Sequence, residues 1–232
     1  MTMLDMHWQD AFIIWSFVWI AVLNIPPGST QIISAYRLNF LHGLISSIVA
    51  FACMFGYIHE NFAAMASVAY FAVDFVNILL NDFVWKVKSY QTPTARYVEY
   101  FHHILCGGFG VFCQIYYKDV CTLDENPFIK FMLAELSTPF LIAWRYYPHN
   151  ALGAIFAVLF FLVRIVYHGG FLIPTFMEQC NRTVSFRFGL LYTAMNVFFL
   201  VMIAAKLYRK IKGDKKEKKL SEGDVTKSKK DK

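Results

Sequence analysis

Long apolar runs alternate with short polar breaks along almost the whole chain. Most of these runs match the roughly 20 residues that a helix needs to cross about 30 Å of hydrocarbon. Seven runs can be marked, at Trp8–Ile25, Leu38–Ile58, Phe62–Trp85, Tyr97–Tyr117, Phe128–Tyr146, Ala151–Ile173 and Val184–Tyr208. The pattern predicts an all-α, polytopic transmembrane bundle of about seven spans, of which the first and fifth are short.

The breaks between the runs carry the residues that end helices. Pro26-Pro27-Gly28, Asn126-Pro127, Pro148-His149-Asn150 and Pro174 each follow or precede an apolar run. Proline lacks the N–H that a helix interior needs, and glycine and asparagine favour turns. These breaks therefore support the predicted boundaries.

Composition and charge support the same class of protein. Hydrophobic residues make up 57% of the chain and charged residues 16%, against about 25% charged in soluble domains. The net charge of +6 falls entirely within residues 209–232. Nucleic-acid binding would need basic residues spread over a folded face, so no nucleic-acid partner is expected. We predict that residues 209–232 form a disordered, basic, cytosolic tail.

A cytosolic tail fixes the expected orientation. With seven spans, residues 1–30 comprise a luminal N-terminus and the first span, and residues 31–208 form the main membrane domain. The cytosolic loops then hold Arg37, Arg145 and the basic residues around Lys86, which agrees with the positive-inside rule. The last four residues include Lys229 and Lys230 in a dilysine pattern, which predicts retrieval to the endoplasmic reticulum (ER).

This topology places two cysteines and one sequon in the lumen. Cys121 and Cys180 both fall in luminal loops, where an oxidising environment would allow a disulfide; the alternative is two free thiols. Asn181 begins the sequon Asn-Arg-Thr and is a candidate for glycosylation, although it lies close to two spans.

Ionisable side chains occur at membrane depth, where they are costly and normally face a bundle interior or a wet cavity. Tyr70, Asp74, Asn77 and Asn81 follow helical spacing and form one stripe on the third run. Asp74 and Glu135 lie near the middle of their spans, and His102-His103 open the fourth run near its cytosolic end. We therefore expect Asp74, Glu135 and the His pair to meet in a cavity on the cytosolic side.

Such a cluster suggests acyl transfer. A histidine beside a carboxylate can act as a general base or as a nucleophile that forms an acyl-imidazole. The candidate catalytic residues are His102, His103, Asp74 and Glu135. For Asp74 and Glu135 a purely structural role remains an equal alternative, and Asn77, Asn81 and Gln114 are interpreted as hydrogen-bond partners between helices.

Three further residues are candidate contacts for a lipid head group: Arg145, Arg164 and His168. Arg145 is alternatively an interfacial anchor, and Arg164 a partner for a buried carboxylate. No metal site is predicted, because adjacent histidines on a helix point about 100° apart and no HxxxH or HxxE pattern occurs nearby.

Several short motifs, in their order and spacing, carry a resemblance to a known family. They are Arg37–His42, Tyr70–Phe75, the pair His102-His103, Glu135–Phe140 with Trp144-Arg145, and Phe160–Arg164. Together they span about Gln31 to Tyr208 and resemble the TLC-domain family, which contains the ceramide synthases and related ER membrane proteins.

The resemblance implies six helices around a lipid-accessible cavity, preceded by one extra span. In ceramide synthases the His pair belongs to the catalytic site, and acyl-CoA is the acyl donor; this implies acyl-CoA as a co-substrate and no tightly bound cofactor. The synthases continue with an aspartate-rich motif, whereas the matching region here is Ala134–Phe140 with a single carboxylate, Glu135. The chain therefore resembles the branch of the family that is tied to lipid homeostasis.

Two functions from different classes follow. The first is an ER lipid-homeostasis protein with a lipid or acyl-chain cavity that acts as an acyltransferase on a lipid amine or hydroxyl. The second is a non-catalytic lipid sensor, carrier or cargo receptor. Membrane lipids are the expected partners in both, and a dimer stays open as an oligomeric state.

Overall fold

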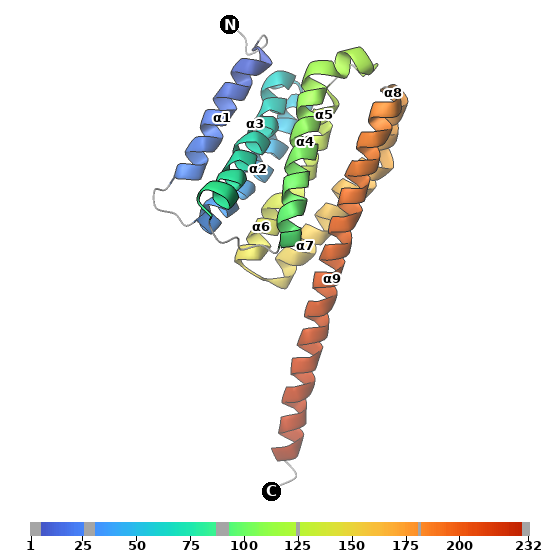
Figure 1. The fold of residues 1–232 in the computed structure, drawn as a ribbon. Helices are drawn as coiled ribbons and strands as arrows, with labels where there is room; N and C mark the ends of the chain where they lie inside the picture. Colours follow the sequence, from blue (N-terminus) through green and yellow to red (C-terminus); the bar gives the residue numbers. More distant parts are fainter. Residues whose placement is uncertain (1–5, 26–30, 87–92, 124–125, 181, 229–232) are drawn as a thin grey trace. The chain divides into compact units, whose positions relative to one another are not determined.

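The computed structural model describes residues 6–25, 31–86, 93–123, 126–180 and 182–228. These residues are almost entirely helical (Figure 1). The elements are α1 (Trp8–Asn24), α2 (Gln31–Met54), α3 (Glu60–Leu79), η2 (Leu80–Val84), α4 (Pro93–Val120), α5 (Pro127–Met132), η3 (Leu133–Ser137), α6 (Thr138–Tyr146), α7 (Asn150–Phe160), η4 (Phe161–Leu172), α8 (Ile173–Gln179) and α9 (Arg182–Ser228). The all-α prediction is confirmed for this part of the chain.

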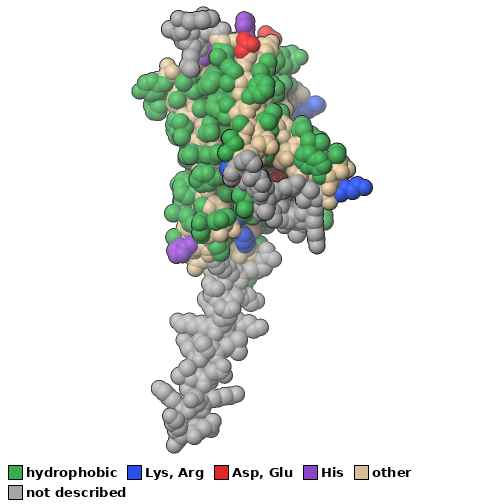
Figure 2. All heavy atoms as spheres, turned by 90° about the vertical axis from the view of Figure 1, so that its left-hand side faces the viewer, with side chains coloured by type: hydrophobic (Ala, Val, Ile, Leu, Met, Phe, Trp, Pro, Cys, Tyr) green, Lys and Arg blue, Asp and Glu red, His purple; other side chains and the backbone are tan. Residues whose placement is uncertain are grey.

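Four helical segments are long and apolar enough to cross a membrane. They are Ile33–Met54, Glu60–Val84, Asn150–Gln179 and Thr183–Tyr208, and the shorter Trp8–Asn24 is also apolar. The chain therefore has the helices of a multi-pass membrane protein. Apolar side chains also cover its outside, as on the face that includes α1 (Figure 2), where Phe17 is 69% exposed.

The predicted break at Pro174 is wrong. Helical structure continues from Asn150 to Gln179, with α7, η4 and α8 following each other directly. Pro174 lies in the first turn of α8, just after the wider π-helical turns of η4. Because the helix continues through this point, the missing N–H of Pro174 interrupts the regular hydrogen-bond pattern, and it does so where the π-helical turns of η4 change to α-helix.

The chain divides into two compact units, residues 1–193 and 194–232. The second unit consists of the rest of α9, which is continuous as far as Ser228. The sequence predicted disorder from residue 209, in a stretch rich in lysine, which is a good helix former. That disorder stays a prediction.

Within the first unit, α3 is the central helix. α1, α2 and α4 all pack against it, and α2 also contacts η3 and α6 (Figure 1). Every side chain from Ala63 to Phe71 is buried, and four of these residues are alanines. Small side chains let neighbouring helices approach closely, which explains why α3 can be surrounded.

Two indoles fix α1 on α3. Trp15 Nε1 donates to the Phe62 carbonyl at 2.9 Å and Trp19 Nε1 donates to the Ala66 carbonyl at 2.8 Å. The two tryptophans are one turn apart, and so are their acceptors, so the contacts set the register between the helices. The first apolar run is therefore an integral wall of this unit.

A polar network joins the beginning of α3 to the end of α4. Gln114 Nε2 donates to Asn61 Oδ1 at 2.7 Å, and Tyr117 Oη donates to Glu60 Oε1 at 2.8 Å. Asn126 adds a donor to Gln114 Oε1 at 3.3 Å. Gln114 thus has the structural role that the sequence indicated.

Candidate functional site

The structure brings His103 and Asp74 together. His103 Nε2 lies 2.9 Å from Asp74 Oδ2, and both side chains are almost completely buried. They come from α4 and α3, whose close approach depends on Gly107, where an added Cβ would lie 3.0 Å from the Cβ of Phe71. His103 therefore meets the helical stripe on α3, whereas the predicted meeting of both histidines with Asp74 and Glu135 in one group is not seen.

The hydrogen bonds of His103 fix where its protons lie. His103 Nδ1 is 2.8 Å from the Glu99 carbonyl oxygen, which can only accept, so Nδ1 carries a proton. A second proton then lies between Nε2 and Asp74 Oδ2, either as an imidazolium and carboxylate or as a neutral pair. Both ring nitrogens of His103 are used in this arrangement, so Nε2 reaches a substrate only by giving up Asp74.

Tyr70 extends this pair towards α2. Its hydroxyl lies 2.8 Å from Asn39 Oδ1 and 3.2 Å from Asp74 Oδ2, and donates its single proton to one of the two. The Tyr70 ring stacks on His42, with the centroids 3.4 Å apart. His42 Nε2 in turn lies 2.9 Å from Ser67 Oγ. The sequence gives no indication of the role of Ser67 or of the stacking role of His42. His42 stands out there only as part of a motif that carries the family resemblance.

Glu135 belongs to a separate group. Arg164 Nη2 donates to Glu135 Oε1 at 3.2 Å, Arg164 Nε donates to the Ala134 carbonyl at 3.0 Å, and Thr138 Oγ1 donates to Glu135 Oε2 at 2.7 Å. The closest approach to the histidines that is seen for Glu135 is 3.9 Å, from Oε2 to His42 Nδ1. Arg164 is thus the partner of a buried carboxylate, one of the two roles expected for it.

His102 points away from the His103–Asp74 pair. Its Nδ1 lies 3.4 Å from Cys106 Sγ, one turn along α4. The edge of Phe71 lies against both histidines, with ring centroids 5.5 Å apart in each case. The four predicted catalytic residues therefore lie in three neighbouring groups: His103 with Asp74, Glu135 with Arg164, and His102 with Cys106. His102 and His103 have different polar partners.

The remaining head-group candidates lie elsewhere. His168 is fully buried, with Nδ1 2.6 Å from Tyr192 Oη and Nε2 3.2 Å from the Lys130 carbonyl. The carbonyl requires the proton on Nε2, and Nδ1 accepts from Tyr192, which describes a neutral, structural histidine. Arg145 is exposed near the end of α6, as expected for an interfacial anchor.

A cavity of about 530 Å³ lies between α1, α2 and the second half of α3. Its apolar walls include Phe12, Ile20, Leu23 and Ile78. Its polar lining residues are Ser16, Asn24, Ser34, Asn39, Asp74, Asn77, Asn81, Arg96 and Glu99. Of the predicted catalytic residues, only Asp74 lines it. The family resemblance implied a cavity among six helices, whereas the extra first helix forms one wall of this cavity.

A charged cluster closes the end of this cavity where α3 and η2 finish and α4 begins. Arg96 donates from Nε and Nη2 to the two carboxylate oxygens of Asp82, both at 2.8 Å, and from Nη1 to Glu99 Oε2 at 2.7 Å. Tyr100 Oη donates to Asp82 as well. This cluster does not stand out in the sequence, although Arg96 and Glu99 at i, i+3 spacing are a recognisable helical pair.

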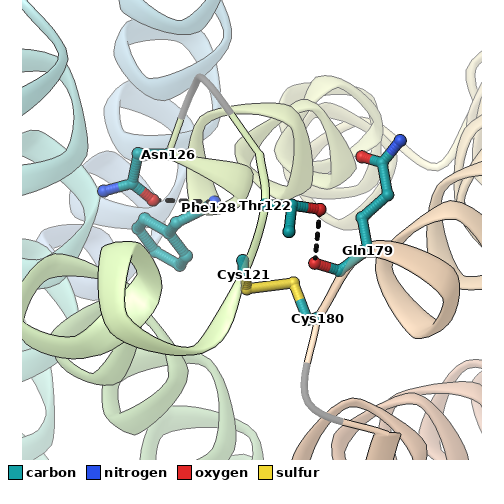
Figure 3. Close-up of a disulfide and its surroundings, with 6 residues drawn as sticks. All are labelled: Cys121, Thr122, Asn126, Phe128, Gln179 and Cys180. Carbon is teal, nitrogen blue, oxygen red and sulfur yellow. Dashed lines mark hydrogen bonds between the residues drawn. A yellow bond between two sulfur atoms is a disulfide. The ribbon is translucent and has the colours of Figure 1, made fainter.

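A disulfide joins the ends of two helices that are distant in sequence. Cys121, just after α4, is bonded to Cys180, just after α8, across 59 residues (Figure 3). Thr122 reinforces the link, because its backbone N–H donates to the Gln179 carbonyl at 2.7 Å. This is the bridge that a shared luminal location allowed.

Other predicted sites lie outside the described residues. Asn181, the glycosylation candidate, and Lys229 and Lys230, the retrieval candidates, are among them. Within the described part of the chain, no three His, Cys, Asp or Glu side chains converge in a group that could hold a metal ion.

Comparison with known proteins adds no further identification. No protein-family model, curated protein or solved structure matches this chain. The likeness to the TLC-domain family is therefore carried by the motifs alone, and the functional argument depends on the geometry of the cavity and the buried polar groups.

Proposed function

We propose that this chain is a seven-span ER membrane protein of lipid homeostasis that binds a lipid in the cavity between α1, α2 and α3. The observation that carries the proposal is the composition of the cavity wall, which is mostly apolar along α1 and carries most of its polar groups on α2, the second half of α3, η2 and the start of α4. An amphiphile with one apolar chain and a small head group matches that distribution.

The size of the cavity supports a ligand with a single chain. A water-sized group takes about 30 Å³, so 530 Å³ holds about 18 such groups. That is the size of one acyl chain with a small head group. The volume also lies within the roughly 300–1,000 Å³ of ordinary small-ligand sites.

Seven spans and an ER location complete the proposal. α4 and the broken segment α5–α6 would supply spans beyond the four long apolar helices and α1. The disulfide is consistent with its end of the bundle facing an oxidising lumen. The basic tail, with Lys229 and Lys230, then lies in the cytosol. The motifs similar to the TLC-domain family support lipid as the ligand class.

Filling the cavity tests lipid binding. Ala72 lines the cavity, and Ala72→Phe would place a ring inside it. Ala21→Phe is the matched control, because Ala21 is exposed on the outside of α1. Native mass spectrometry of the purified proteins should find a retained single-chain lipid in wild type and Ala21→Phe and a much smaller amount in Ala72→Phe. Equal lipid retention in all three proteins would refute this cavity as the binding site.

Acyl transfer is the second candidate function, and the contact between His103 and Asp74 is the observation that favours it. A carboxylate that orients an imidazole is the arrangement of a general base. The binding function is preferred because both nitrogens of His103 are occupied and neither histidine lines the cavity.

The two functions separate in one assay. Purified wild type and a His102→Ala/His103→Ala variant are incubated with acyl-CoA and mixed lipids, and the products are compared. An acylated product found only with wild type would establish catalysis. Identical products would exclude it. His103→Gln, which keeps a polar side chain, should still retain lipid if the chain only binds.

A further inference from the structure

The polar stripe on α3 ends in the cavity wall. Asn77 follows Asp74, the partner of His103, on the same face of the helix. Asn81 Nδ2 donates to Asn77 Oδ1 at 3.2 Å. Because Asn77 Oδ1 can only accept, the amide N–H of Asn81 faces Asn77, and the Asn81 oxygen points the other way.

The side-chain oxygen of Asn81 has no partner at the end of this polar stripe. Asn81 is 9% exposed and lines the cavity, and its Oδ1 has no hydrogen-bond partner. Among the described residues, Ser46 Oγ is the other buried side-chain atom without a partner, and Ser46 is not part of the cavity lining. A buried acceptor without a donor is costly, which makes this position a place for a donor from a ligand.

The other amide groups of the lining already have partners. Asn39 Oδ1 lies 2.8 Å from the Tyr70 hydroxyl, and Asn39 donates to the Ala35 carbonyl at 2.8 Å. Asn24 donates to the Ile20 carbonyl at 2.7 Å. The nearby charged groups also offer mainly acceptors, because the Arg96 guanidinium already donates to Asp82 and Glu99. The polar end of the cavity therefore offers oxygen acceptors, and its one guanidinium is already paired with carboxylates.

Asn81 also lies in an unusual backbone segment. It belongs to η2, a π-helical turn that directly continues α3. Single π turns within α-helices are rare, and they frequently occur at functional sites because they turn a side chain away from the regular helical position.

We propose that Asn81 Oδ1 accepts a hydrogen bond from the head group of a single-chain lipid. The ligand then carries a hydroxyl or an ammonium group, and a lipid whose head group is a bare carboxylate binds more weakly. This inference rests on the proposed lipid binding. It adds the chemical class of the head group and assigns a specificity role to a residue that the sequence indicated as structural. The bound donor supplies the partner that Asn81 Oδ1 lacks at the end of the polar stripe.

Three probes with the same chain length test the proposal. Monooleoylglycerol presents hydroxyls, oleylamine presents an ammonium, and oleate at neutral pH presents acceptors only. Binding to the purified full-length protein is followed by native mass spectrometry, which leaves the contacts of Trp15 and Trp19 that hold the α1 wall of the cavity unchanged. Wild-type specificity should favour monooleoylglycerol or oleylamine over oleate by at least about fivefold, as expected for one buried hydrogen bond.

Asn81→Leu keeps the volume and removes the acceptor. It should retain binding of the oleyl chain while the preference for donor head groups falls to less than about twofold. Ser46→Ala is the matched control, because it removes the other partnerless buried atom away from the cavity, and it should keep the wild-type preference. Circular dichroism and thermal unfolding establish that both variants are folded.

Three other results would each refute one part of the proposal. Equal binding of all three probes by wild type would refute donor recognition and leave lipid binding intact. A preference for oleylamine that survives Asn81→Leu but is lost in Glu99→Gln would assign recognition to the charged cluster instead. Failure of wild type to bind any probe or to retain any lipid would refute the proposed function itself.

Discussion

Two interior regions of the first unit are built from similar apolar helices but are packed very differently. Between α1, α2 and α3 lies the cavity of about 530 Å³. Between α4, α5, α8 and the start of α9, aromatic rings fill the space. The hollow beside these rings, which residues of α3, η3 and η4 also line, is about 20 Å³. There Phe109 stacks on Phe188 with centroids 3.5 Å apart and meets Phe131 and Phe176 edge to face.

The difference follows from the side chains that each region receives. Phenylalanines from four elements interlock at the aromatic centre, and little volume is left because large flat rings pack in offset and edge-to-face pairs. The cavity region receives Ala35, Ala72, Ser16 and Ser34, which are too small to fill the same spacing between helices. We infer that the aromatic centre provides rigidity and that the α1–α3 region provides a site for a ligand.

The largest contrast is expected from truncation of an apolar side chain in each region. Phe109→Ala should lower the free energy of unfolding by about 3–5 kcal/mol, because Phe109 is 6% exposed and contacts four aromatic rings. Leu23→Ala, in the wall of the existing cavity, should cost less than about 1 kcal/mol. Reversible unfolding of the detergent-solubilised protein measures both, and equal losses would contradict the contrast.

The disulfide should matter next, because it holds the ends of α4 and α8 around the aromatic centre. Replacement of Cys121 and Cys180 by serine should lower the free energy of unfolding by about 2–4 kcal/mol, since the bond closes a long loop in the unfolded chain. The bond itself is checked by mobility on a non-reducing gel. Identical mobility of wild type and the double variant, with and without reductant, would show that the cysteines are not bridged.

Two glycines on α4 give a smaller and more local test. A Cβ on Gly110 would lie 2.6 Å from Val68 Cγ2 and 2.7 Å from Phe128 Cζ, whereas one on Gly108 would meet nothing within 4 Å. Gly110→Ala should therefore destabilise the protein by about 1–3 kcal/mol. Gly108→Ala should be neutral or stabilise by up to about 1 kcal/mol through helix propensity. The midpoints of thermal unfolding compare them, and a reversed order would mean that α3 and α4 are packed differently.

The smallest change in stability is expected when the cavity is filled. Ala72→Phe should change the free energy of unfolding by less than about 1 kcal/mol, because the ring enters empty space. Ala64→Phe, at a fully buried position of the same helix, should cost at least about 1–3 kcal/mol through overpacking. If both variants lose stability equally, the cavity does not exist in solution.

The sequence predicts well which residues lie on the same face of a single helix. The stripe from Tyr70 to Asn81 follows directly from helical spacing, and proximity to His103 follows from expecting buried charges to find each other. The sequence does not predict that Phe71 lies against both histidines or that α1 forms a wall of the cavity, and it leaves open which carboxylate Arg164 contacts. These features depend on how helices cross and rotate against one another, which no local pattern encodes.

The pair of Glu135 and Arg164 also has a consequence for how the chain is made. The two residues are 29 positions apart and belong to neighbouring helical segments joined by the short turn between α6 and α7. Each charge alone costs about 2.5–3.5 kcal/mol at the centre of an inserting helix. If the η3–α6 segment spans the membrane as proposed, the two charges neutralise each other, and the energetically favourable route is for both segments to leave the translocon as one hairpin. Biogenesis of this region is then a joint step, and neutralising either residue alone would leave its partner charge to delay insertion.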